Sequence, residues 1–242
     1  MGAYLIVGAA AILGAIIQAT MGFGSAVVLL NVIPLFFPLN KAIALMQASI
    51  IVLNVTFTAR FWKKVRWDVL WPAVIPGTIL GLIFTLWSVQ MDVSALTIAL
   101  GVVLILLSIY ELFLKGNVKV RPSKTTGFFM GSLSGIGNAF FGLAGPPIAM
   151  YLVPSIDDNL EYFATSQAFF FFTSLSCITA RLLSGIYEVS DLPFLAVVAS
   201  CLVIGIVIGL KILKKIDGEL LKKLIYGFIG LNGIYIIIKQ IV

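Results

Sequence analysis

Ten apolar segments separated by short polar stretches run the length of the chain. They lie at residues 3–20, 26–38, 41–59, 69–89, 93–114, 126–140, 146–155, 161–183, 191–210 and 219–239. A helix needs about 20 apolar residues to cross a hydrocarbon core, and most of these segments approach or reach that length. The alternation of apolar and polar residues that a membrane barrel requires is absent. The pattern therefore predicts an all-α polytopic membrane protein.

Two of the segments, 26–38 and 146–155, are too short to cross a bilayer by themselves at about 1.5 Å per residue. Each follows a glycine-rich break, GFGS at residues 22–25 and GLAG at residues 142–145. Glycine permits a tight turn and the close approach of a ligand, and Pro146 suits a first helical turn. A helix that restarts inside the membrane presents free N–H donors and the positive end of its dipole, which together favour an anion.

The two breaks belong to an internal repeat with an offset of 120 residues. The same offset places Gln18 over Asn138, Pro34 over Pro154 and Gln47 over Gln167, and an offset of 121 places Arg60 over Arg181. We therefore predict one transmembrane domain over residues 1–242. It consists of a first repeat (1–114), a cytoplasmic linker (115–125) and a second repeat (126–242), each repeat with about five segments.

Loop charges indicate how the repeats are oriented. The loops 60–66, 115–124 and 211–223 are rich in lysine and arginine, whereas 88–92 and 184–191 contain neither. Basic loops stay in the cytoplasm, so loop 60–66 and its counterpart 184–191 are predicted on opposite sides of the membrane. The repeats then have inverted topology, and both termini of this cell-membrane protein are predicted to face outside.

Inverted repeats with broken or re-entrant helices at the centre are typical of transporters. We predict that the two breaks face each other near the bilayer midplane and bind a small anionic substrate. The predicted substrate-binding residues are Gln18, Gly22, Gly24, Ser25, Gln47, Asn54, Asn138, Gly142, Gly145, Pro146, Gln167 and Arg181.

Some of these residues have a second interpretation. The amides of Gln47, Gln167 and Asn54 can bind substrate oxygens or only join helices. Arg60 and Arg181 can attract anions, or they can be charges that extend from helix ends toward the interface. Arg181 is the stronger candidate, because its side of the membrane needs no positive charge for topology. Other glycines, such as Gly131 and Gly135, have the spacing of close helix packing.

Composition narrows the class further. The chain is 61% hydrophobic and 11% charged, against about 25% charged in soluble domains. Its net charge of +6 comes from loop clusters, so no nucleic-acid partner is expected. The sequence has no histidine, no carboxylate deep in a segment, and two cysteines inside apolar runs, Cys177 and Cys201. We therefore expect no enzyme activity, no metal and no cofactor.

The motifs GFGS and GLAGPP, each followed by a further proline, and PGTILG at residues 76–81 resemble the sulfite exporter TauE/SafE family. The resemblance covers nearly the whole chain. It implies a membrane permease for sulfite, thiosulfate, sulfonates or other small organic anions. The family often has a run of glycines at each break, which Ser25 and Ala144 interrupt here.

An anion channel and a membrane assembly protein without transport activity remain alternatives. Residue patterns leave open the anion, the direction of transport and the oligomeric state, including a homo-oligomer. Three driving forces for transport stay open. They are the substrate gradient with the membrane potential, a proton carried on the substrate, and Na⁺ bound by backbone carbonyls. The topology of two pairs of segments also stays open. Each pair consists of full membrane crossings or forms a re-entrant hairpin; the pairs are 3–20 with 26–38 and 126–140 with 146–155.

Overall fold

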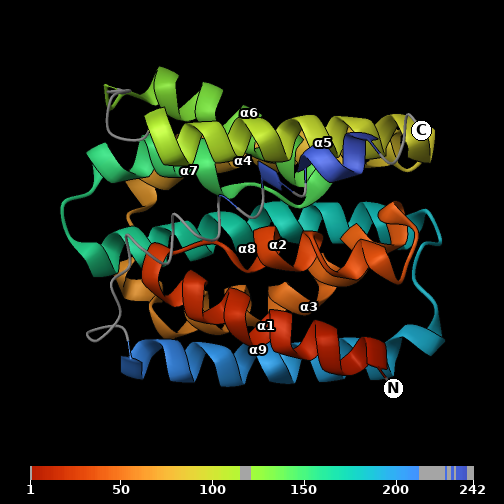
Figure 1. Ribbon diagram of the computed structural model, residues 1–242. Helices are drawn as coiled ribbons and strands as arrows, with labels where there is room; N and C mark the ends of the chain where they lie inside the picture. Colours follow the sequence, from red (N-terminus) through yellow and green to blue (C-terminus); the bar gives the residue numbers. More distant parts are fainter. Residues whose placement is uncertain (1, 115–120, 213–226, 228–229, 232, 239–242) are drawn as a thin grey trace.

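The computed structural model describes residues 2–114, 121–212, 227, 230–231 and 233–238. All regular elements within these ranges are helical (Figure 1). The first half contains α1 (Gly2–Met21), α2 (Ser25–Leu30), α3 (Leu39–Arg60), α4 (Trp67–Ser88) and α5 (Val93–Ile109). The second half contains α6 (Lys124–Phe141), α7 (Gly145–Leu152), α8 (Asn159–Leu183) and α9 (Leu192–Ile212). Much of the predicted segment 219–239 and of the linker lies outside the described residues.

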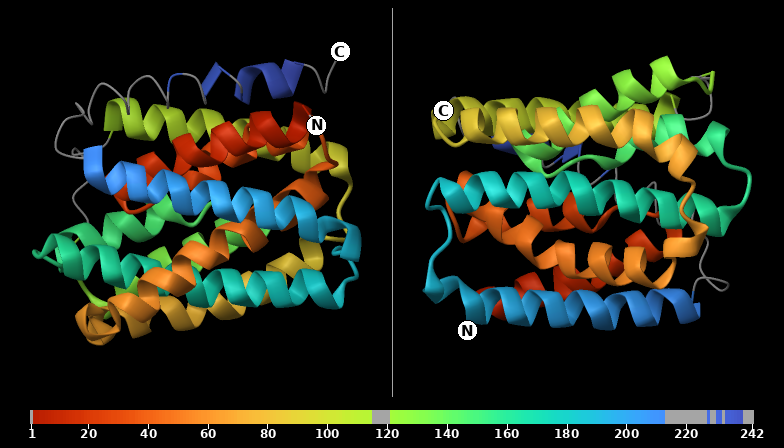
Figure 2. Two further views of the ribbon diagram at one scale, coloured as in Figure 1. Left: turned by 90° about the horizontal axis from the view of Figure 1, so that it is seen from below. Right: turned by 180° about the vertical axis from the view of Figure 1, so that it is seen from behind.

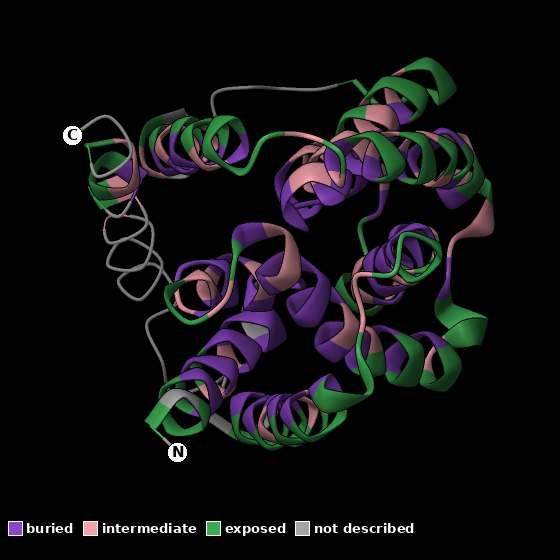
Figure 3. Ribbon diagram, turned by 90° about the vertical axis from the view of Figure 1, so that its right-hand side faces the viewer, coloured by how far each residue is buried: buried purple, intermediate pink, exposed green. Residues whose placement is uncertain are grey.

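Four stretches of the described chain are long and apolar enough to cross a membrane. They are Leu39–Arg60, Trp67–Ser88, Asn159–Leu183 and Val189–Gly209, and shorter apolar helices lie at Tyr4–Ala19, Ser25–Leu35 and Val93–Ile109. Seen along the bundle, buried positions face inward and exposed positions lie at the perimeter (Figure 3). Many of the exposed residues are large and apolar, including Ile75, Ile79 and Ile83 on α4. Such a perimeter suits lipid rather than water.

Contacts between helix termini define two ends of the bundle. At one end Lys41 forms an ion pair with Asp191, and the ring of Phe194 contacts Tyr4 and Phe37. We call it the Lys41 end, and it lies to the right in Figure 1, where α1, α3 and α9 all begin.

The opposite end, which we call the Arg66 end, holds the turn between α3 and α4. Here Phe61 contacts Phe163, and the Tyr151 hydroxyl donates to the Val69 carbonyl. Helix α3 therefore ends, α4 and α8 begin and α7 ends at this end. Helix α6 begins here too, because a Cβ on Gly127 would meet the Tyr151 ring.

The two halves of the chain each contribute a hairpin. Helices α1 and α3 both begin at the Lys41 end, so the chain between them enters the bundle, turns after Met21 and returns to the end where it started. Helices α6 and α8 both begin at the Arg66 end, so α6 and α7 form a hairpin that enters from the opposite side. The turns at residues 22–24 and 142–144 coincide with the two glycine-rich sequences.

Glycines allow neighbouring helices to pack with their backbones in contact. A Cβ on Gly131 would collide with the backbone of Ala73, and one on Gly135 with the backbone of Gly77, so α6 and α4 cross closely. Helix α1 lies along α9 (Figure 2), where a Cβ on Gly205 would lie 2.5 Å from the Ile12 carbonyl oxygen. These contacts confirm the packing interpretation of the glycines outside the breaks.

Candidate functional site

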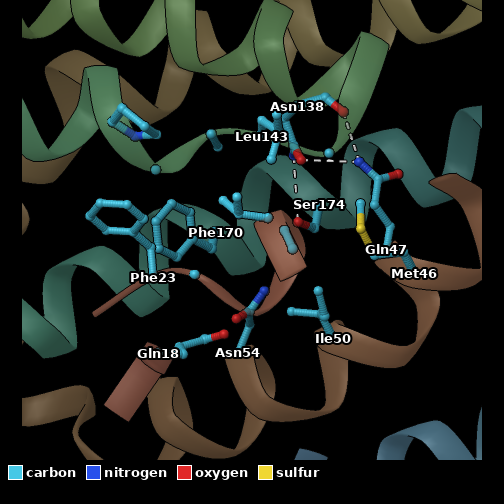
Figure 4. A pocket seen from close by; sticks show the side chains of 17 residues that line it. Gln18, Phe23, Met46, Gln47, Ile50, Asn54, Asn138, Leu143, Phe170 and Ser174 are labelled. Atoms are coloured by element: carbon cyan, nitrogen blue, oxygen red, sulfur yellow. Dashed lines mark hydrogen bonds between the residues drawn. The ribbon is translucent and has the colours of Figure 1, made fainter. Parts of the chain in front are cut away.

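A cavity of about 50 Å³ lies where the two breaks meet α3 and α8 (Figure 4). This volume has room for a few water molecules or a small ion, at about 10–15 Å³ for each water molecule. It is lined by Gln18, Phe23, Gly24, Ala26, Val27, Met46, Gln47, Ile50, Asn54, Asn138, Gly142, Leu143, Ala144, Gly145, Pro146, Phe170 and Ser174.

Each turn between hairpin helices depends on glycine. Gly24 has a φ of 136°, and a Cβ there would lie 2.7 Å from Cγ2 of Ile17. Gly142 ends α6 in the left-handed conformation with a φ of 70°. A Cβ on Gly145 would lie 2.5 Å from Cδ2 of Phe23, so the ring from the first break rests against the backbone of the second. The two breaks are therefore in contact.

The backbone supplies fewer donors at the second break than a helix N-terminus normally does. Pro146 and Pro147 both lie in the first turn of α7 and have no N–H. Helix α2, which follows the first break, has six residues and hence few aligned peptide dipoles. Side-chain amides must therefore provide much of the cavity's polarity.

A chain of hydrogen bonds lies behind the second break. The guanidinium of Arg181 donates to Oε1 of Gln47 at 2.6 Å and to the carbonyl of Ala139 at 2.7 Å. Nε2 of Gln47 donates to the backbone oxygen of Asn138 at 2.8 Å and to its Oδ1 at 3.0 Å. Nδ2 of Asn138 then donates to the Ser174 hydroxyl at 3.5 Å (Figure 4).

A second set of amides lies at the first break. Nε2 of Gln167 donates to the Gly22 carbonyl at 2.8 Å, and Nε2 of Gln18 donates to Oε1 of Gln167 at 3.3 Å. The repeat relates Gln167 to Gln47 and Gln18 to Asn138. Equivalent positions thus bond near each turn, although Gln167 binds the carbonyl of Gly22 and Gln47 binds the carbonyl of Asn138.

Arg181 is the charged residue bonded directly to this network. Its side chain is 2% exposed, and no carboxylate among the described residues lies within 4.0 Å of it. Nearby, the Tyr187 hydroxyl donates to the Ala44 carbonyl at 3.1 Å. Burial raises the pKa of Tyr187 to about 12, so this group stays a neutral donor at physiological pH.

The structure brings most of the predicted site residues together. Eight line the cavity: Gln18, Gly24, Gln47, Asn54, Asn138, Gly142, Gly145 and Pro146. Gly22, Gln167 and Arg181 do not line it. Arg181 and Gln167 are hydrogen-bonded to the lining residues Gln47 and Gln18, and Gly22 is hydrogen-bonded to Gln167. Ser25 is buried against Gly14 and lies outside the lining.

Ser174, Ile50 and Phe170 line the cavity and were missed by the sequence analysis. The repeat contained a signal for Ser174, because an offset of 120 places the predicted Asn54 over it, and the same offset relates Ile50 to Phe170. Met46 is a further lining residue, and it gives no signal in the sequence because methionine is common in any apolar helix.

Comparison with known proteins identifies the family. Neither the search of curated proteins nor the search of solved structures found a significant match. The family model described as "Sulfite exporter TauE/SafE" matches residues 6–236, nearly the whole chain. The two glycine turns that meet at the cavity carry the motifs on which the resemblance was first based. The chain therefore belongs to the TauE/SafE family of membrane transport proteins.

Proposed function

We propose that this protein exports small anions, most plausibly sulfite or other sulfur oxyanions and organosulfonates, across the cell membrane. Substrate would bind at the cavity between the two breaks, and the two ends of the bundle would open in turn. Family membership supports the transporter class and the sulfur-containing substrates.

One observation carries the mechanism: the cavity lining is made of pairs that the repeat relates. Six pairs separated by 120 positions account for twelve of the seventeen lining residues. Their hairpins enter from opposite ends, which is the arrangement of inverted repeats around a central site. The pairs are Gln18 and Asn138, Phe23 and Leu143, Gly24 and Ala144, Ala26 and Pro146, Ile50 and Phe170, and Asn54 and Ser174. If the two repeats exchanged conformations, the cavity would open first to one side of the membrane and then to the other.

Charge at the two ends supports an orientation. The Arg66 end collects Arg60, Lys63, Lys64, Arg66, Arg121, Lys124 and Lys211. The Lys41 end has Lys41 beside two carboxylates, Glu188 and Asp191. By the positive-inside rule, this distribution supports a cytoplasmic Arg66 end, with the start of α1 outside.

The cavity suits an anion for two reasons. Its lining among the described residues includes no carboxylate, and the guanidinium of Arg181 lies directly behind Gln47. An inside-negative membrane potential favours the exit of an anion by about 2.3 kcal/mol per charge per 100 mV. Export along the potential therefore requires no intramembrane carboxylate.

Saturable uptake of sulfite into vesicles that contain the purified protein tests the proposal. The key variant is Gly145→Leu, whose side chain would fill space beside Phe23, and the matched control is Gly227→Leu, where a Cβ meets no atom of the described residues within 4 Å. We expect saturable flux in wild type and the control, and loss of flux in folded Gly145→Leu protein. Flux that rises linearly with concentration, or ionic current, would instead indicate a channel. The absence of flux for every sulfur oxyanion tested would reject the proposal.

A further inference from the structure

Arg181 is among the largest fully buried side chains of the described chain. Its two bonds end on oxygens, Oε1 of Gln47 and the backbone oxygen of Ala139. A guanidinium is a donor only, and it keeps its proton in proteins. Whatever atom of Gln47 faces Arg181 must therefore be an acceptor.

This requirement fixes the direction of each hydrogen bond as far as the cavity. Because Oε1 of Gln47 faces Arg181, Nε2 must face Asn138, where the backbone oxygen can only accept. The second proton of Nε2 then requires Oδ1 of Asn138 at 3.0 Å. Asn138 is left with Nδ2 toward Ser174 and the cavity (Figure 4). The chain starts at a positive charge and ends in an N–H group at the cavity.

The hydrogen bonds described at the first break include no charged group. There the Gly22 carbonyl fixes Gln167 as a donor, and Oε1 of Gln167 accepts from Nε2 of Gln18. Arg60, the counterpart of Arg181, is exposed, and its guanidinium lies 5.7 Å from the ring centre of Phe61. The two breaks therefore differ in charge, although their amides occupy equivalent positions.

We infer that Arg181 is a positioning residue, which makes the cavity selective for anions by fixing the orientation of Gln47 and Asn138 without contacting the anion itself. This inference rests on the proposed function and adds the residue that determines selectivity. Hydrogen bonds in such a chain polarise one another, so a charge at its start strengthens the last donor.

Titration calorimetry of sulfite into detergent-solubilised protein tests the inference. Arg181→Gln should weaken sulfite binding about tenfold, since Gln47 can then turn and Asn138 loses its fixed orientation. Arg181→Lys keeps a charged donor and should stay within about threefold of wild type. The matched control is Arg60→Gln at the equivalent position of the first half, which should leave the affinity unchanged.

Gln47→Glu reverses the orientation of Asn138. The carboxylate keeps the bond to Arg181 but loses the donor that Nε2 offers to the backbone oxygen of Asn138, so the unfolding temperature is measured first to show that the variant is folded. It cannot donate, so Asn138 must turn Nδ2 toward it and present Oδ1 to the cavity. Sulfite affinity should fall at least about tenfold in the folded variant. Unchanged affinity in this variant would overturn the inference.

A double-mutant cycle distinguishes positioning from direct contact. If Arg181 acts through Gln47, the variant with both Gln47→Leu and Arg181→Gln should bind sulfite within about twofold of Gln47→Leu alone. If the two losses of sulfite affinity instead multiply, to near a hundredfold in the double variant, Arg181 makes an independent contact with the anion and the inference is overturned. If wild type and Arg181→Gln bind sulfite with equal affinity, the inference about Arg181 is overturned, but the proposed function stands. Wild type that binds no sulfite would reject both.

Discussion

Four buried side-chain oxygens among the described residues have no hydrogen-bond partner: Ser25 Oγ, Asn54 Oδ1, Thr58 Oγ1 and Ser134 Oγ. A buried polar atom without a partner costs about 1–3 kcal/mol of stability. Asn54 lines the cavity, whereas Ser134 does not. Such a cost is commonly retained where a ligand uses the group, so Asn54 and Ser134 should respond differently to replacement.

Replacing Asn54 should separate stability from binding. We expect Asn54→Leu to raise the free energy of unfolding by about 1 kcal/mol, because the unpartnered amide oxygen is removed. The same variant should weaken sulfite binding several-fold, because a polar group of the cavity is lost. Thermal unfolding of the protein in detergent, with and without sulfite, measures both effects.

Ser134→Ala is the matched control for this prediction. It also removes a buried oxygen without a partner, so it should stabilise the protein, but its affinity for sulfite should equal that of wild type. If Asn54→Leu bound sulfite as tightly as wild type, Asn54 would join helices only, which is the second interpretation of its amide.

At the level of elements, the crossing of α4 and α6 is the tightest contact that the glycines reveal. Gly135→Ala places a Cβ against the backbone of Gly77, which cannot move aside as a flexible side chain could. We expect the free energy of unfolding to fall by about 2–4 kcal/mol. Denaturation with sodium dodecyl sulfate followed by circular dichroism measures this free energy. The control is Gly227→Ala, whose Cβ has no atom of the described residues within 4 Å. An unchanged midpoint for Gly135→Ala would refute the close crossing.

Hydropathy alone was sufficient to predict most of the helices. The predicted segments 41–59 and 126–140 correspond to Leu39–Arg60 and Lys124–Phe141, a difference of two residues or fewer at each end. A hydrophobic run marks a helix because its backbone must bond internally in lipid. Glycine and proline are local signals as well, and the chain turns between α1 and α2 and between α6 and α7 where they occur.

The site was only partly predictable, because its polarity depends on contacts between distant positions. The bond from Arg181 to Gln47 joins residues 134 positions apart, and no local pattern predicts it. A repeat offset of 120 relates equivalent positions, and from Asn54 it would have added Ser174 to the prediction. The offset of 121 misleads at Arg60, which is exposed although its counterpart Arg181 is buried.

On the scale of the whole molecule, the two ends are held together with different strength. At the Lys41 end, Lys41 pairs with Asp191 at 2.7 Å and with Glu188 at 3.2 Å. The side chain of Lys41 is 17% exposed and that of Asp191 is 8% exposed. At the Arg66 end, Arg66 lies 3.6 Å from Glu161, and its side chain is 42% exposed. Exposed pairs contribute little, so the Lys41 end should be the more firmly closed of the two.

Labelling of a cysteine in the cavity tests this asymmetry. In a protein with Cys177→Ala and Cys201→Ala, Asn54→Cys should react with a membrane-impermeant thiol reagent mainly from the Arg66 side. Lys41→Gln should raise the rate from the Lys41 side about fivefold, since a partly buried ion pair is worth about 1 kcal/mol. The matched control, Arg66→Gln, should leave that rate unchanged.

The outcome of this experiment also bears on the mechanism. Alternating access requires that opening one end disfavours opening the other, so faster labelling of Lys41→Gln from its own side should accompany slower labelling from the Arg66 side. The physical reason is that both ends close on the same rigid hairpins, which cannot tilt in two directions at once. A rate that rises from both sides, or wild-type protein labelled equally from both, would indicate a continuous pore and favour an anion channel over a transporter.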